Sequence, residues 1–154
     1  MKNFLKFLFS IAICQAAGLI GAVFTTPAIP GWYRTLSKPF FSPPNEVFLP
    51  VWIFLFLLMG ISLFLVWTEK EKENKKAILI FSVQLILNVF WSIIFFGLNS
   101  IVLALLEIII LWLAILATII SFYKLSKTAG LLLVPYILWV SFALILNFFI
   151  WRLN

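Results

Sequence analysis

Residues 47–67 read VFLPVWIFLFLLMGISLFLVW, and none of these 21 residues carries an ionisable side chain. An α-helix rises about 1.5 Å per residue, so a helix of this length covers the hydrocarbon core of a bilayer, which is about 30 Å thick. The stretch therefore predicts a transmembrane helix.

Four further stretches have a similar length and apolarity, at about residues 4–24, 77–97, 101–122 and 130–151. The connections between the five are short, except for residues 25–46. A chain of 154 residues with five such stretches has room for one compact unit and no additional soluble domain. We expect an all-α membrane protein, a five-transmembrane-helix bundle that forms a single domain over residues 1–154.

The composition agrees with lipid as the main solvent, since 65% of residues are apolar, 10% are charged, and the mean hydropathy is +1.21. Histidine is absent and the only cysteine, Cys14, lies within an apolar stretch. These facts exclude a His-based catalytic triad, an intrachain disulfide and a zinc site. The net charge is +6, but the cations stand at the ends of apolar stretches, so we expect no nucleic-acid partner.

The basic residues predict how the helices are oriented. Alternating loops put eight cations on one side of the membrane and three on the other. The first group is Lys2, Lys6, Lys70, Lys72, Lys75, Lys76, Lys124 and Lys127, and the second is Arg34, Lys38 and Arg152. The positive-inside rule then predicts a cytoplasmic N-terminus and an external C-terminus, in a bacterial cytoplasmic membrane. The first apolar stretch is longer than the h-region of a signal peptide, so we expect it to be retained in the mature protein.

The long connection, residues 25–46, is rich in aromatic residues and proline. Pro39, Pro43 and Pro44 restrict the backbone and should make it stiff, as in a lid over a binding site. The alternative is an interfacial aromatic belt, in which Trp32 and Tyr33 lie among the lipid headgroups. The residues of the loop do not choose between the two.

The third and fifth stretches each carry a polar and aromatic face. Helical spacing aligns Gln84, Asn88, Trp91 and Phe95 on one helix, and Tyr136, Trp139, Ala143 and Asn147 on the other. Because an amide facing lipid loses its hydrogen bonds, both faces should point inward, joined by the aromatic pair Trp52 and Phe56 of the second stretch. Such faces either hold helices together or line a slot for a flat ligand, and the small Ala143 between larger neighbours favours the slot.

Glu107 is the only carboxylate deep within a stretch, and it should face the bundle interior. A hydrogen-bonded clamp on a neighbouring helix is the favoured interpretation, and a proton-coupling site in a transporter is the alternative.

The loop and several later motifs resemble the translocator protein family (TspO/MBR), also called tryptophan-rich sensory proteins or peripheral benzodiazepine receptors. The loop signature is Trp32-Tyr33-x-x-Leu36-x-Lys38-Pro39-x-x-x-Pro43-Pro44. The later motifs follow in the family's order: Pro50-Val51-Trp52, Gln84-Leu85-x-Leu87-Asn88 with Trp91, and Pro135-Tyr136-x-x-Trp139-x-x-Phe142-Ala143-x-x-x-Asn147.

The resemblance implies a five-helix bundle, often dimeric, whose first loop closes over a pocket for porphyrins and benzodiazepine-type ligands. By motif, Trp52 and Trp139 resemble two tryptophans implicated in light-dependent breakdown of protoporphyrin IX. We expect the ligand-binding residues to be Trp32, Tyr33, Pro43, Pro44, Phe56, Gln84, Asn88, Trp91, Ala143 and Asn147. No cofactor is required, protoporphyrin IX is the expected ligand, and the lack of histidine favours its metal-free form.

Three departures limit the resemblance. Phe40-Phe41 replaces the Ser-Trp common in relatives, and residues 146–152 lack the central tyrosine of a cholesterol motif, so a sterol partner is only weakly implied. The third stretch also lacks a Gly-x-x-x-Gly pattern, so a homodimer would use the small residues Ala17, Gly18, Gly21 and Ala22 of the first stretch. Those residues could equally contact a helix of the same chain.

Three hypotheses follow. The leading one is a membrane-embedded porphyrin-binding sensor or scavenger. Whether it also degrades porphyrin in the light, as an enzyme, is left open. The others are a transporter of porphyrins, sterols or other amphipathic ligands, and a regulatory partner without turnover.

Overall fold

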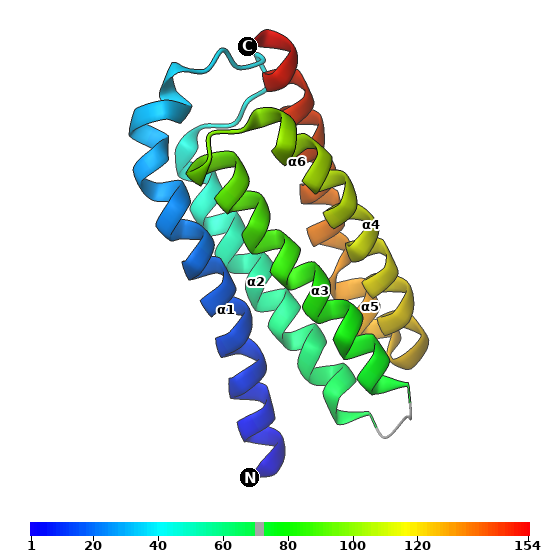
Figure 1. The fold of residues 1–154 in the computed structure, drawn as a ribbon. Helices are drawn as coiled ribbons and strands as arrows, with labels where there is room; N and C mark the ends of the chain where they lie inside the picture. The colour runs from blue at the N-terminus through cyan, green and yellow to red at the C-terminus, as the bar shows by residue number, and fades with distance from the viewer. Residues whose placement is uncertain (70–72) are drawn as a thin grey trace.

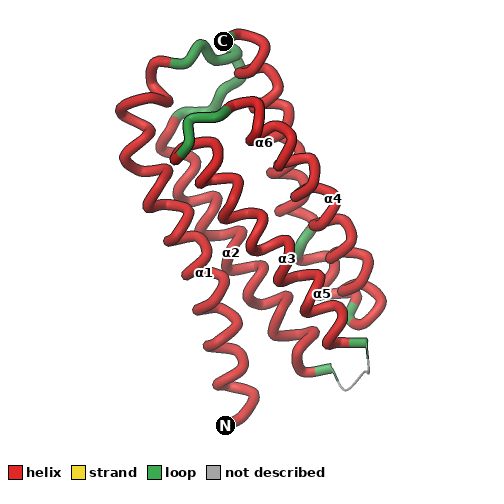
Figure 2. The backbone as a smooth tube through the Cα atoms, in the orientation of Figure 1, coloured by secondary structure: helices red, strands yellow, loops and turns green. Residues whose placement is uncertain are grey.

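The computed structural model describes residues 1–69 and 73–154, which form helices joined by loops (Figure 1, Figure 2). Within these residues five helical segments are long and apolar enough to cross a membrane. Their bounds are Lys2–Tyr33, Asn45–Thr68, Asn74–Gly97, Ile101–Leu125 and Lys127–Leu153. The predicted all-α fold class with five transmembrane helices is confirmed.

The five segments comprise six α-helices and two π-helical turns. In chain order these are α1 (Lys2–Ala28), η1 (Ile29–Tyr33), α2 (Asn45–Thr68), α3 (Asn74–Ser92), η2 (Ile93–Gly97), α4 (Ile101–Leu125), α5 (Lys127–Leu132) and α6 (Val134–Leu153). α1 packs along α2 and α3, α3 packs along α4, and α4 packs against both α5 and α6. α2 packs on α5, and the helices run side by side along the bundle (Figure 1).

The first segment extends beyond its predicted end at residue 24, because η1 continues the helix to Tyr33. The prediction that residues 25–46 form a loop is therefore too long: the irregular part, which we call the cover loop, is residues 36–44. Pro27 and Pro30 both lie within this longer segment. In a transmembrane helix, prolines are tolerated when hydroxyl groups and π-turns take up the displaced backbone bonds. Here the segment continues past both prolines, with a kink at Gly31, whose ψ of −107° is not helical.

Two further interruptions follow from individual residues. Asn99 has a φ of 53°, the left-handed conformation that asparagine adopts more readily than most residues, and it turns the chain between η2 and α4. The last segment breaks at Leu133, directly before α6, whose first turn contains Pro135. Proline has no N–H to donate to the preceding turn, so the helix restarts at this point.

The half of the bundle near the N-terminus has a tightly packed interior. Phe81 of α3 stacks on Phe122 of α4 with ring centroids 5.5 Å apart, and Ser62 of α2 donates to the Ala129 carbonyl at 2.7 Å. Gly130 of α5 lies directly against α4, because a Cβ built on it would be 2.6 Å from Tyr123 Cβ and 2.8 Å from Tyr123 Cα. This packing fixes the position of α5 on α4.

The two termini lie at opposite ends of the bundle (Figure 1). The chain therefore separates the two groups of cations as the orientation prediction requires, although Lys70 and Lys72 lie outside the described residues. Which end faces the cytoplasm stays a prediction.

Candidate functional site

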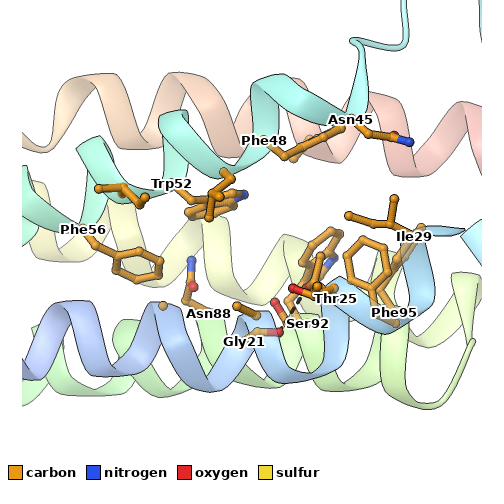
Figure 3. A pocket seen from close by; sticks show the side chains of 18 of the residues that line it. Gly21, Thr25, Ile29, Asn45, Phe48, Trp52, Phe56, Asn88, Ser92 and Phe95 are labelled. Atoms are coloured by element: carbon orange, nitrogen blue, oxygen red, sulfur yellow. Dashed lines mark hydrogen bonds between the residues drawn. The ribbon is translucent and has the colours of Figure 1, made fainter.

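A cavity of about 730 Å³ lies between α1, α2, α3 and α6, in the half of the bundle near the C-terminus. Figure 3 shows its side chains projecting from α1 and α2 toward one another. Eight of the twelve residues predicted for the site line it: Tyr33, Trp52, Phe56, Asn88, Trp91, Trp139, Ala143 and Asn147. The structure thus brings together aromatic and amide side chains from four segments of the sequence.

The other four predicted residues lie near the cavity without lining it. Trp32 is half-buried against Phe95, with ring centroids 5.4 Å apart, and Gln84 is buried one turn before Asn88. Pro43 and Pro44 belong to the cover loop, where Pro44 directly precedes the first residue of α2. Helical spacing places Gln84 on the correct face of α3 but does not give the depth at which the cavity ends.

The wall contributed by α1 was not predicted as part of the site. Its small residues Ala17, Gly18, Gly21 and Ala22 line the cavity, and so does Thr25. A Cβ at Gly18 would lie 2.7 Å from the Phe56 ring. This small-residue face therefore contacts α2 and the cavity of the same chain, as the second interpretation of these residues expected, and the homodimer stays a prediction.

Aromatic rings on α2 and on α6 form part of the wall. On α2, Trp52 packs against Phe56 with ring centroids 5.6 Å apart. On α6, Trp139 meets the α2 residue Phe48 at 6.1 Å and Phe142 of its own helix at 5.5 Å. The cavity therefore offers flat apolar surfaces of the kind that bind planar aromatic molecules.

The tryptophans of the cavity differ in their hydrogen bonding. Trp91 Nε1 donates to Asn147 Oδ1 at 3.3 Å, and Asn147 Nδ2 donates to the Ile101 carbonyl at 3.2 Å, so Trp91 is tied to α6 and α4. Within residues 1–69 and 73–154, the indole N–H groups of Trp52 and Trp139 have no such partner.

A second set of polar side chains lies at the inner end of the cavity. Asn88 Nδ2 donates to the Tyr136 hydroxyl at 2.9 Å, and this hydroxyl donates to Gln84 Oε1 at 2.9 Å. Gln84 Nε2 in turn contacts Met59 Sδ at 3.9 Å. The predicted inward direction of both polar faces is confirmed, and here they join α3 to α6 and α2.

The cover loop closes the end of the bundle. Tyr33, which is only 3% exposed, packs its ring against Phe95 and Phe96, and Lys38 Nζ lies 4.6 Å from the Tyr33 ring centre. Phe41 packs on Phe149 at 5.4 Å. These contacts favour the lid interpretation over the belt, since Lys38 and Phe41 of the cover loop pack on Tyr33, which lines the cavity, and on α6.

The side chain of Asn154 ties the cover loop to the end of α6. Asn154 Oδ1 accepts from the Ser37 N–H at 3.0 Å, and Asn154 Nδ2 donates to the Ser37 carbonyl at 2.9 Å. Asn154→Ala removes both bonds, so we expect the loop to open more often. Hydrogen exchange at the Ser37 amide should accelerate by about tenfold, as expected for the loss of two exposed hydrogen bonds. Unchanged exchange would show that the aromatic contacts alone hold the loop.

The cavity reaches the outer surface of the bundle between α1 and α2. Its lining includes Leu19, Leu49 and Ile53, which are 69%, 64% and 52% exposed. Gln15 of α1 crosses this boundary and donates to the Ile53 carbonyl at 3.1 Å. Because these residues lie within transmembrane segments, the opening faces the hydrocarbon of the bilayer.

Glu107 lies on α4 and is 8% exposed, as predicted for an inward-facing residue. It does not line the cavity, and among the described residues neither carboxylate oxygen has a hydrogen-bond partner. The interpretation of Glu107 as a hydrogen-bonded clamp between helices is therefore not supported.

A buried carboxyl group without a partner should destabilise the fold. We expect Glu107→Met to raise the free energy of unfolding by about 1–3 kcal/mol, the usual cost of an unsatisfied buried polar group. The measurement is the melting temperature in detergent, with Glu73→Met, which changes an exposed carboxylate, as the control. A lower melting temperature for Glu107→Met would show that the carboxyl group makes a stabilising contact.

Comparison with known proteins identifies the family of this chain. The model of the TspO/MBR family matches residues 10–152. The chain belongs to the TspO/MBR family. It is 43% identical to the tryptophan-rich protein TspO of Chlorobaculum tepidum, over 99% of this chain and 98% of the relative. It is 34% identical to the tryptophan-rich sensory protein of Cereibacter sphaeroides, covering 96% of this chain and 90% of that protein. The human translocator protein is 38% identical over 80% of this chain and 75% of its own length.

The family match confirms the resemblance that the sequence motifs indicated. Those motifs now have a common location, since Trp52, Asn88, Trp139 and Ala143 all line one cavity. TspO/MBR membership together with five apolar helices makes this a multi-pass membrane protein.

Proposed function

We propose that this protein binds a flat, metal-free tetrapyrrole such as protoporphyrin IX in the cavity and serves as a membrane sensor or scavenger of it. The observation that carries the proposal is the pair of cavity tryptophans, Trp52 and Trp139, on α2 and α6, whose indole N–H groups have no protein partner among the described residues. The volume of about 730 Å³ falls within the range of about 300–1,000 Å³ usual for small-molecule pockets. A relative bearing the name tryptophan-rich sensory protein supports the sensory role.

The chemistry of the wall suits such a ligand. Aromatic rings and aliphatic side chains bury the faces of the macrocycle, and the few polar groups fix its orientation. Tight axial ligation of haem iron would need a histidine or thiolate. The sequence has no histidine, and Cys14 does not line the cavity. The metal-free porphyrin is therefore the favoured form.

Light-dependent breakdown of the bound pigment is the catalytic part of the proposal. An illuminated porphyrin passes energy or an electron to molecular oxygen, and oxygen then attacks the macrocycle. The indoles of Trp52 and Trp139 can supply an electron to the oxidised pigment or trap a radical. That both side chains line the cavity supports this role.

The test follows porphyrin fluorescence in lipid nanodiscs, first in darkness and then under illumination. We expect the protein to quench and bleach protoporphyrin IX, and Trp52→Phe and Trp139→Phe to slow bleaching by about tenfold or more, as for loss of a group that acts in the reaction. Trp67→Phe is the matched control, because Trp67 does not line the cavity. Bleaching that proceeds equally in all variants would remove both tryptophans from the mechanism, and absence of quenching would refute porphyrin binding.

The opening between α1 and α2 favours one alternative, a transporter of porphyrins or other amphipathic ligands, because ligand could leave the bilayer through it. Transport predicts flux across sealed liposomes. Accumulation no faster than in empty vesicles, with binding intact, would exclude it.

A further inference from the structure

The polar side chains at the inner end of the cavity form a chain of hydrogen bonds in which donor and acceptor are fixed at each contact. It runs from Met59 on α2 through Gln84 on α3 and Tyr136 on α6 to Asn88, again on α3. Of the four, only Asn88 lines the cavity, and Figure 3 shows its side chain among those of Trp52 and Phe56. The question is which end of the Asn88 amide faces the ligand.

Met59 determines the orientation of Gln84. A thioether sulfur accepts hydrogen bonds weakly and has no hydrogen to donate. The end of the Gln84 amide that contacts Met59 Sδ, at 3.9 Å, is therefore the NH₂ group. With Gln84 and Met59 1% and 0% exposed, no solvent offers either end of this amide another partner. The carbonyl end, Oε1, must then face Tyr136.

The orientation of the Gln84 amide fixes the Tyr136 hydroxyl, which in turn fixes the orientation of the Asn88 amide. Its hydroxyl has a single hydrogen, which is donated to Gln84 Oε1 at 2.9 Å. The hydroxyl oxygen can then only accept from Asn88, so the Asn88 NH₂ group lies on the Tyr136 side, at 2.9 Å. Within the described chain no hydrogen bond uses Asn88 Oδ1, and this carbonyl oxygen is left for the cavity.

We propose that Asn88 Oδ1 is a fixed hydrogen-bond acceptor that makes the cavity select ligands with an N–H or O–H group at this position. Gln84 and Tyr136 are positioning residues for it. The inference deepens the proposed function, because it uses the same cavity and adds a donor requirement to the flat aromatic ligand.

The selection arises mainly because a ligand without a donor at this position binds with a less favourable free energy. Asn88 is 6% exposed and shares this end of the cavity with Trp52 and Phe56, so a ligand that fills the space also removes water from Oδ1. A ligand without a donor leaves a buried acceptor unsatisfied, and one with its own acceptor there adds repulsion. The amide cannot turn to offer its NH₂ group without breaking the bond to Tyr136.

Carbazole and dibenzofuran form a matched pair of probes for this acceptor. Both are flat tricyclic molecules of nearly the same shape, but carbazole carries an N–H donor where dibenzofuran carries an oxygen acceptor. Each compound is equilibrated with nanodiscs that contain the protein and with empty nanodiscs, and the difference gives the specific binding. We expect carbazole to bind about three- to tenfold more tightly, which corresponds to one hydrogen bond.

Three variants test the origin of this ratio. Asn88→Leu removes the acceptor at similar volume, and Tyr136→Phe releases the Asn88 amide, so in both the ratio should fall toward one. Ser141→Ala is the matched control, because Ser141 is also an α6 hydroxyl residue that bonds a neighbouring helix, through Trp112 Nε1 at 2.8 Å, and it does not line the cavity. It should keep the wild-type ratio. Melting temperatures show whether each variant is folded, and Asn88→Leu keeps the test open if Tyr136→Phe is not.

Several outcomes would overturn the inference. They are equal binding of the two probes or no specific binding by the wild-type protein, a preference for dibenzofuran, and a carbazole preference that survives in Asn88→Leu. Protoporphyrin IX binding is measured separately on the same samples. Porphyrin binding without probe discrimination refutes only the acceptor, and discrimination without porphyrin binding refutes only the tetrapyrrole proposal.

Discussion

Gly130→Ala is expected to lower the free energy of unfolding by about 3 kcal/mol or more, at the upper end of the usual cost of overpacking. The new methyl group would lie 2.6–2.9 Å from the Cβ, Cα and N atoms of Tyr123, and two of these three atoms belong to the α4 backbone. Backbone atoms cannot move aside as a flexible side chain can, so α5 must shift away from α4. The measurement is thermal unfolding in detergent.

Gly21→Ala provides the graded comparison. Its methyl group would meet the Ser92 side chain, with Oγ at 3.1 Å, and no backbone atom of a neighbouring helix within 4 Å. We expect a loss of less than about 1 kcal/mol, since alanine is also the better helix former. Equal losses in the two variants would show that the contact between Gly130 and Tyr123 does not determine the position of α5.

Ala143→Trp is expected to weaken binding of protoporphyrin IX by about a hundredfold, corresponding to about 2.7 kcal/mol. Ala143 lines the cavity one turn after Trp139, so the larger ring would occupy the space between the aromatic surfaces. The fold should be retained, because the added ring enters a cavity and not a packed interior. The measurement is a fluorescence titration of the porphyrin with protein in nanodiscs.

The matched control is Ala16→Trp, which adds the same ring to the exposed surface of α1. It should bind porphyrin as the wild-type protein does. If Ala143→Trp binds equally well, the ligand occupies another part of the protein.

Most of the fold could be predicted from the sequence because transmembrane helices are long, apolar and separated by polar or flexible residues. The start of α4 follows Asn99 as expected, and the inward faces of α3 and α6 are correct because amides avoid lipid. The end of the first segment could not be predicted in the same way. Pro27 and Pro30, which would usually stop a helix in water, here lie within a membrane-spanning segment that continues through a kink at Gly31.

Site residues with aromatic or polar side chains could be predicted from the sequence, whereas residues that contribute only the shape of the cavity were harder to predict. Trp52, Asn88 and Trp139 stand out as aromatic or polar residues on inward faces. Gly18 and Gly21 contribute to the wall by their lack of a side chain, which in a sequence is equally typical of close helix packing. Gln84 lies deeper in the bundle than the cavity reaches. How far the cavity reaches depends on how α2 and α6 separate, and the spacing of residues along α3 does not predict that.

Under the proposed function, the opening between α1 and α2, with exposed Leu19, Leu49 and Ile53 on its rim, makes the bilayer the source of the ligand. An apolar pigment partitions strongly into lipid, so the relevant quantity is its mole fraction in the bilayer and not its concentration in water. The apparent dissociation constant, expressed against total ligand, will rise in proportion to the amount of lipid in the sample. Occupancy at a fixed ratio of pigment to lipid will stay constant on dilution, so a sensor of the proposed kind would respond to the composition of its own membrane.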